Sequence, residues 1–142
     1  MNKHRVLFLC VHNSARSQMA ATYMNHLAGE SFEAESAGFS PAPINPLAIE
    51  VMKEEGIDIS QNPISDVFKL IQQGRFYGYV ITVCDESESE KCPIFPGVTQ
   101  RLHWSFKNPA YFEGTYEEKI IKTREVRDQI KEKVQAFINN TK

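Results

Sequence analysis

The stretch that decides the fold is Arg5-Val6-Leu7-Phe8-Leu9-Cys10-Val11-His12-Asn13-Ser14-Ala15-Arg16-Ser17. Its apolar half predicts a buried strand that ends at Cys10, and Ser17 can cap the N-terminus of the helix that follows. The loop between them is just long enough to surround a tetrahedral oxyanion. Its backbone N–H groups, the positive end of the helix and the Arg16 guanidinium would face that anion. The same field would stabilise the thiolate of Cys10 and make it a nucleophile near neutral pH.

Two residues of the predicted oxyanion loop need separate comment. Asn13 suits a left-handed backbone conformation and can bond neighbouring amides. His12 either adds positive charge to the loop or only exposes its ring, and the sequence favours neither. A single Cys at a strand end is usually a small buried apolar residue, but the spacing of Cys10 and Arg16 argues against that interpretation here. The predicted anion-binding set is Val11, His12, Asn13, Ser14, Ala15 and Arg16.

Length, composition and charge indicate one globular domain over residues 1–142. The 142 residues are 42% apolar and 24% charged, as in ordinary globular proteins. A formal net charge of -2 offers no general attraction for nucleic acid. The N-terminal apolar run is too short for a signal peptide or a membrane span. Three cysteines do not make a secreted disulfide framework, so we expect a cytoplasmic protein whose thiols stay reduced unless they are catalytic.

Helix and strand signals alternate along the rest of the chain. Caps, glycines and apolar periodicity predict helices over 17–28, 45–56 and 65–74 and from 115 onward, and strands over 32–37, 77–84 and 101–106. We expect the charged face of the last helix to be solvated. The alternation predicts a single three-layer α/β domain, in which a four-stranded parallel sheet is flanked by helices.

This topology brings two cysteines to the same edge of the sheet. Cys10 ends the first predicted strand and Cys84 ends the third, and parallel sheets bind ligands at the carboxyl ends of their strands. We therefore expect the two thiols to be neighbours. The alternative is that Cys84 belongs to the strand core and that Cys92 is an incidental surface thiol.

The motifs of the chain resemble those of a known enzyme superfamily. Cys10-x5-Arg16-Ser17 with Asn13 inside the loop, followed by Gln18-Met19-Ala20, is similar to the signature of the low-molecular-weight tyrosine phosphatases. Its thioredoxin-coupled arsenate reductase branch is indicated by Cys84 and Cys92, together with Ser36-Ala37-Gly38, Gly56-Ile57-Asp58-Ile59-Ser60 and His103-Trp104-Ser105-Phe106. The resemblance covers nearly the whole chain and implies the phosphatase-like fold.

The resemblance also implies a reaction. Cys10 attacks arsenate, Cys84 attacks the sulfur of Cys10 as arsenite leaves, and Cys92 then passes the disulfide outward. Arg16 holds the anion, and the Ser17 hydroxyl supports the thiolate. Arsenate is the implied substrate, with phosphate or sulfate as mimics, and thioredoxin is the implied reductant. The electrons come from thiols, so we expect no cofactor, and we expect a monomer without nucleic-acid or membrane partners.

The chain departs from that family at Asn108. The family has an Asp-Pro pair whose aspartate protonates the leaving oxygen, and the matching pair here is Asn108-Pro109. An amide cannot act as a general acid. The loss should harm phosphoester hydrolysis more than reduction, because arsenate can bring its own protons. Asp85, Glu86 and Glu113 are possible substitutes that the sequence cannot place.

Three other functions compete with arsenate reduction. A low-molecular-weight phosphatase acting on phosphotyrosine or a small phosphoester would use the same loop. An oxyanion-binding protein with impaired catalysis would account for Asn108. A metal site built from Cys10, His12 and other ligands is disfavoured, because no C-x2-4-C pair exists and Arg16 would repel a cation.

Overall fold

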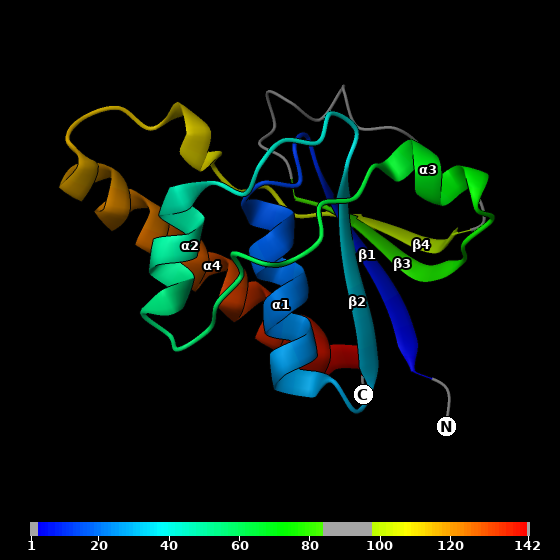
Figure 1. Cartoon of the computed structure of the whole chain (residues 1–142). Coiled ribbons are helices and arrows are strands. Elements are labelled where there is room, and N and C mark those ends of the chain that lie inside the picture. Colours follow the sequence, from blue (N-terminus) through cyan, green and yellow to red (C-terminus); the bar gives the residue numbers. More distant parts are fainter. Residues whose placement is uncertain (1–2, 84–97, 142) are drawn as a thin grey trace.

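The computed structural model describes residues 3–83 and 98–141 and confirms the predicted α/β sheet. Four parallel strands lie in the order β2-β1-β3-β4 (Figure 1). The central strand β1 is buried on both faces, as expected for a parallel sheet covered by helices. The strands are β1 (His4–Cys10), β2 (Phe32–Gly38), β3 (Tyr77–Thr82) and β4 (Val98–His103).

Helices cover both faces of the sheet and make the predicted three layers. On one face, Val6 and Phe8 of β1 join a core cluster with α1, α2 and α4. On the other face, Leu7 and Leu9 pack with residues of α3. The helices are α1 (Arg16–Ala28), α2 (Pro46–Lys53), α3 (Val67–Gln72) and α4 (Tyr116–Thr141), with a short 3-10 helix, η2, over Pro109–Tyr111. No helix in the described ranges is long and apolar enough to cross a membrane.

Local sequence signals set most helix starts where the sequence predicted them. Asn45 accepts a hydrogen bond from the backbone N–H of Leu47 at 2.8 Å and caps α2. Asp66 caps α3 in the same way, because its side-chain oxygen accepts from the backbone N–H of Phe68 at 2.8 Å. Thr115 and Glu118 form a reciprocal capping box at the start of α4, with hydrogen bonds of 3.1 and 3.3 Å.

The predicted strand over 101–106 is wrong in its position. β4 spans Val98–His103, and its register pairs His103 with Thr82, the last residue of β3. Strand length here is set by the neighbouring strand, and the apolar alternation continues past it. Trp104 and Phe106 are buried beyond the end of β4. The third strand also ends at Thr82, and Cys84 lies outside the described residues.

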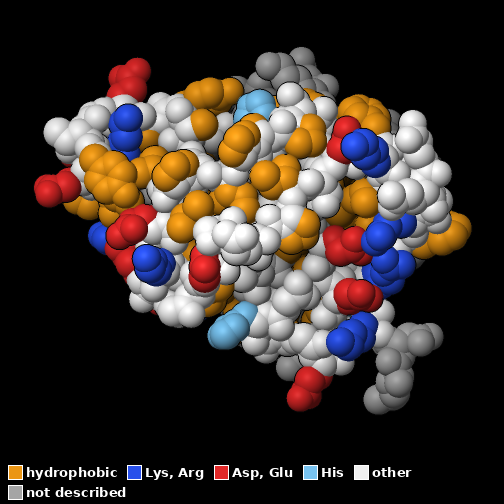
Figure 2. All heavy atoms as spheres, viewed as in Figure 1, with side chains coloured by type: hydrophobic (Ala, Val, Ile, Leu, Met, Phe, Trp, Pro, Cys, Tyr) orange, Lys and Arg blue, Asp and Glu red, His pale blue; other side chains and the backbone are white. Residues whose placement is uncertain are grey.

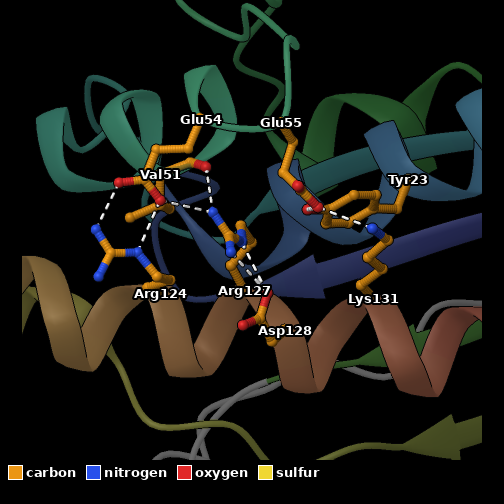
Figure 3. A network of polar contacts seen from close by, with 8 residues as sticks. All are labelled: Tyr23, Val51, Glu54, Glu55, Arg124, Arg127, Asp128 and Lys131. Carbon is orange, nitrogen blue, oxygen red and sulfur yellow. Dashed lines mark hydrogen bonds and ion pairs between the residues drawn. The ribbon is translucent and has the colours of Figure 1, made fainter.

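The charged face of α4 was predicted to be solvated, and this is wrong in its middle part. Arg124 and Arg127 both donate to the carboxylate of Glu54, just after α2, at 2.6 to 2.8 Å (Figure 3). Arg127 is 7% exposed and also donates to the carbonyl of Val51. One turn further, Lys131 pairs with Glu55. The cations of α4 therefore fasten this helix to the end of α2.

We predict that Glu54→Gln lowers the free energy of unfolding by about 2 kcal/mol at neutral pH, because the buried Arg127 loses an ionised partner. Hydrogen bonds from Arg124 and Arg127 lower the pKa of Glu54 from 4.5 to about 2. A carboxylate whose pKa falls on folding stabilises the protein fully above its unfolded pKa. The difference between variant and wild type should therefore shrink as the pH falls from 4.5 toward 2.

Urea unfolding of both proteins across this acidic range measures that difference. Glu125→Gln, an exposed carboxylate on the same helix, is the matched control and should change stability by less than about 0.5 kcal/mol. A difference between Glu54→Gln and wild type that stays constant with pH would contradict the assigned ion pairs.

Candidate active site

The loop between β1 and α1 is held from outside by the segment that follows β2. Backbone N–H groups of this segment donate to loop carbonyls: Ser40 to Val11 at 2.8 Å, Ala42 to His12 at 3.0 Å and Asn45 to Ser14 at 2.8 Å. A trans peptide points its C=O and its N–H in opposite directions. The loop N–H groups that follow these carbonyls are therefore turned to the inner side, where an anion would sit.

Asn13 is the turning point of the loop. It is buried and has a φ of 55°, so it adopts the left-handed conformation that the sequence suggested. Its backbone N–H donates to the sulfur of Cys10 at 3.2 Å. Its side-chain oxygen accepts from the backbone N–H of Ser65 at 2.9 Å, and its side-chain nitrogen donates to Ser17 Oγ at 2.8 Å. Asn13 thus contacts the thiol directly and through Ser17.

The Ser17 side chain bonds the thiol of Cys10 and does not cap α1. α1 begins at Arg16, Ala15 occupies the N-cap position, and no side-chain hydrogen bond caps the helix. The prediction that Ser17 caps α1 is therefore wrong. Its Oγ lies 2.9 Å from the sulfur of Cys10. This oxygen accepts from Asn13 and leaves its hydroxyl hydrogen available to Cys10, and Ser17 does not cap the helix because it lies inside α1, after the N-cap position.

Arg16 is a buried cation at the first position of α1. It is 2% exposed, and its Nη1 donates to the carbonyl of Phe106 at 3.2 Å. This bond ties the loop to the segment that follows β4. A buried guanidinium beside inward-facing N–H groups favours an anionic ligand.

Positive charge at this site is local. On the face shown in Figure 2, hydrophobic side chains gather over the carboxyl end of the sheet, and charged side chains lie mostly toward the margins. Among the described residues, Arg16 and the inward-turned loop N–H groups supply attraction for an anion. His12 is half-buried, and its Nδ1 lies 2.8 Å from the carbonyl of Ser40, so this nitrogen carries a proton. The His12 ring is therefore only partly exposed, and its hydrogen bond to Ser40 holds it against the segment that follows β2.

Asn108 has a structural role that the sequence analysis missed. Its side-chain oxygen accepts from the backbone N–H of Ala110 at 3.0 Å and caps η2. It is 6% exposed and lies two residues after Phe106, whose carbonyl contacts Arg16. Aspartate and asparagine cap helices about equally well. The amide therefore keeps the cap and lacks only the acidic proton.

Of the remaining predicted residues, Glu113 is exposed and its backbone carbonyl accepts from Lys122, and four others lie outside the described part of the chain. These are Cys84 and Cys92, with Asp85 and Glu86 as possible acids. The last described residue before them, Val83, donates its N–H to the carbonyl of Leu9 at 2.8 Å. The chain therefore leaves β3 directly beside the strand that ends at Cys10. In the ranges 3–83 and 98–141, no group of three His, Cys, Asp or Glu side chains is placed to hold a metal ion.

Gly38 is a site residue that the sequence analysis quoted only as part of a motif. It lies opposite Cys10 in the register of β1 and β2. A Cβ atom there would come within 2.7 Å of the backbone nitrogen of Asn13 and 2.8 Å of the carbonyl carbon of His12. Only glycine lets the end of β2 approach the loop this closely. The sequence signal that could have identified Gly38 as a site residue is a glycine at the end of a predicted strand.

Comparison with known proteins finds similar chains over nearly the full length. A family model described as low molecular weight phosphotyrosine protein phosphatase matches residues 5–142. The arsenate reductase of Halalkalibacterium halodurans is 38% identical over 143 residues, which cover 100% of each chain. A solved structure of an arsenate reductase in the phosphate binding state has a TM-score of 0.77 at 26% identity and covers 98% of this chain and 99% of its own. A thioredoxin-dependent arsenate reductase from Corynebacterium glutamicum has a TM-score of 0.61 at 32% identity, over 94% of this chain and 63% of that one.

We predict that Gly38→Ala lowers the free energy of unfolding by about 1–3 kcal/mol and weakens phosphate binding, because the new methyl group displaces loop backbone. Urea unfolding and calorimetric titration with phosphate measure the two effects. Gly78→Ala in β3 is the matched control, since its Cβ atom would lie 3.6 Å from the nearest atom, the carbonyl oxygen of Arg5. Equal behaviour of the two variants would rule out the close approach at Gly38.

Proposed function

The chain belongs to the low molecular weight phosphotyrosine protein phosphatase family, and from that premise we propose that it reduces arsenate to arsenite with Cys10 as the nucleophile. The observation that carries the proposal is the sulfur of Cys10, which accepts from the backbone N–H of Asn13 and lies 2.9 Å from the Ser17 hydroxyl, inside a loop whose carbonyls face outward. Full-length similarity to arsenate reductases selects arsenate over a phosphoester. These relatives bear out the arsenate reductase branch that the motifs indicated.

The first step places arsenate in the loop. The thiolate of Cys10 attacks arsenic(V), an As–S bond forms, and an As–O bond breaks as that oxygen leaves as water. The inward N–H groups and Arg16 offset the charge of the oxygens. Protonated arsenate supplies the protons for the leaving oxygen, so the step does not require a carboxylic acid at Asn108.

The second step transfers two electrons from sulfur to arsenic. We propose that the thiolate of Cys84 attacks the sulfur of Cys10, that the As–S electron pair stays on arsenic, and that arsenite departs. The product is a Cys10–Cys84 disulfide. Cys92 then attacks Cys84, which frees Cys10 as a thiolate. The similarity to a thioredoxin-dependent enzyme supports a thioredoxin dithiol as the reductant of the final Cys84–Cys92 disulfide.

The proposed reaction has consequences for the oligomeric state and the cellular location of the protein. All three thiols belong to one chain, so a monomer suffices. The thiols of the resting enzyme must be reduced, which favours the cytoplasm. No metal or organic cofactor enters the proposed steps.

We predict arsenate-dependent oxidation of NADPH when the protein is combined with thioredoxin and thioredoxin reductase. Cys10→Ser, Cys84→Ser and Cys92→Ser should each abolish turnover. In a single turnover without thioredoxin, Cys92→Ser should release one equivalent of arsenite and stop as a Cys10–Cys84 disulfide, whereas Cys84→Ser should release none.

Absence of arsenate-dependent NADPH oxidation in the wild type would refute the proposal. Hydrolysis of p-nitrophenyl phosphate that survives both Cys84→Ser and Cys92→Ser, without arsenate reduction, would favour the phosphatase alternative. Circular dichroism of each variant shows whether the fold is retained.

Asn108→Asp should raise the hydrolysis of p-nitrophenyl phosphate by about 100-fold, because it restores a general acid where hydrolysis needs one. Arsenate reduction should change much less, since arsenate carries protons. The substitution preserves the cap of η2, so stability should be nearly unchanged. Asn108→Ser, which also caps but carries no acid, is the control. Unchanged hydrolysis in Asn108→Asp would show that no acid is missing at this position.

A further inference from the structure

Gln18 is a buried amide in the first turn of α1 that the proposed reaction does not use. It is 2% exposed, and both ends of its amide are engaged. Its nitrogen lies 3.0 Å from the carbonyl of Pro63, and 3.1 and 3.3 Å from the backbone and side-chain oxygens of Asn13. An NH2 group has two hydrogens, so one bonds Pro63 and the other is shared between the two oxygens of Asn13.

The oxygen of Gln18 is held as well. It accepts from the side-chain nitrogen of Asn62 at 3.2 Å, and this nitrogen also lies 3.2 Å from the hydroxyl of Thr22. One donor therefore faces the oxygen of the Gln18 amide and three acceptors face its nitrogen. This arrangement selects a single orientation, in which the NH2 group points at Asn13.

The orientation of Gln18 determines that of Asn13. The carbonyl of Asn13 faces Gln18, so the peptide N–H of Ser14 faces the inner side of the loop. The side-chain oxygen of Asn13 is held by two donors, Gln18 and the N–H of Ser65. The amide of Asn13 then presents its nitrogen to Ser17 Oγ, which leaves the serine hydrogen free to donate to the Cys10 thiolate.

We propose that Gln18 is a positioning residue that sets the ionisation of Cys10 through Asn13 and Ser17. It donates to both the backbone carbonyl and the side-chain oxygen of Asn13, and thereby keeps the N–H of Ser14 and the hydroxyl of Ser17 aimed at the site. Removal of its NH2 group leaves the Asn13 side-chain oxygen with the Ser65 N–H as its donor and leaves the Asn13 carbonyl without the Gln18 hydrogen bond, so the orientation of Asn13, and through it that of Ser17, is held less firmly. This inference rests on the proposed function only in taking Cys10 as the nucleophile.

The test measures the thiol itself and does not use arsenate. In a chain carrying Cys84→Ser and Cys92→Ser, Cys10 is the one remaining cysteine. Its rate of alkylation by iodoacetamide is recorded against pH, with and without phosphate. Gln18→Met, which keeps the length and lacks the donors, should reduce alkylation near neutral pH by about tenfold and move the midpoint of the profile upward. Phosphate should protect Cys10 less well than in the parent.

Two further variants separate positioning from stability. Asn25→Leu removes a different amide of α1, which bonds the backbone of Ala34 at 2.8 and 2.9 Å and does not touch the loop. It should lower stability without moving the alkylation profile. Gln18→Glu keeps the shape of the side chain and should move the midpoint upward, like Gln18→Met, so a folding defect in one variant leaves the other as the test.

An unchanged profile in both Gln18 variants would overturn the inference. So would a shift of the same size in Asn25→Leu, because the effect would then follow stability alone. The alkylation profile tests the role of Gln18 and the arsenate assay tests the proposed function, so either one can give a negative result without the other. A shifted profile in a protein that does not reduce arsenate would contradict the proposed function and leave the role of Gln18 standing.

Discussion

The hydrogen bond between Ser17 and Cys10 is the interaction on which the rest of the site depends. When Cys10 is a thiolate its sulfur carries no proton, so the serine hydroxyl donates to it, and Asn13 bonds a lone pair of the serine oxygen and leaves that hydrogen free. Asn13 in turn needs a left-handed backbone and two donors on its side-chain oxygen. Cys10, Asn13, Ser17 and Gln18 are all buried. Reversing one of the amides in this hydrogen-bond network would therefore leave a buried donor or acceptor without a partner and would lower the stability of the fold.

The fold supplies the partners that surround this hydrogen-bond network. Residues after β2 bind the loop carbonyls from outside, and Gly38 allows β2 to come close enough for them to do so. Arg16 connects the start of α1 to the segment after β4 through Phe106. The site is thus assembled from several connections at one edge of a parallel sheet, where such folds bind ligands. We propose that Asn108 and the two later cysteines, Cys84 and Cys92, direct this site to reduction and away from hydrolysis.

Much of this could be predicted because the signals are local. The strand that ends at Cys10, the caps at Asn45 and Asp66 and the left-handed Asn13 depend on neighbouring residues. The failures involve partners distant in sequence. Ser17 meets all rules for a helix cap, but a turn of the chain brings Cys10 to its hydroxyl. β4 ends where β3 ends, which an apolar pattern cannot show, and Arg127 is buried where it bonds Val51 and Glu54 at the end of α2.

The central claim is that Cys10 starts a relay that leaves the oxidising equivalents on the other two cysteines. Peptide mapping by mass spectrometry, after one equivalent of arsenate is added to the fully reduced protein without thioredoxin, tests it most directly. We expect a Cys84–Cys92 disulfide, a free Cys10 and one equivalent of arsenite. An unmodified protein, or arsenite formed with Cys84 and Cys92 both still reduced, would contradict it.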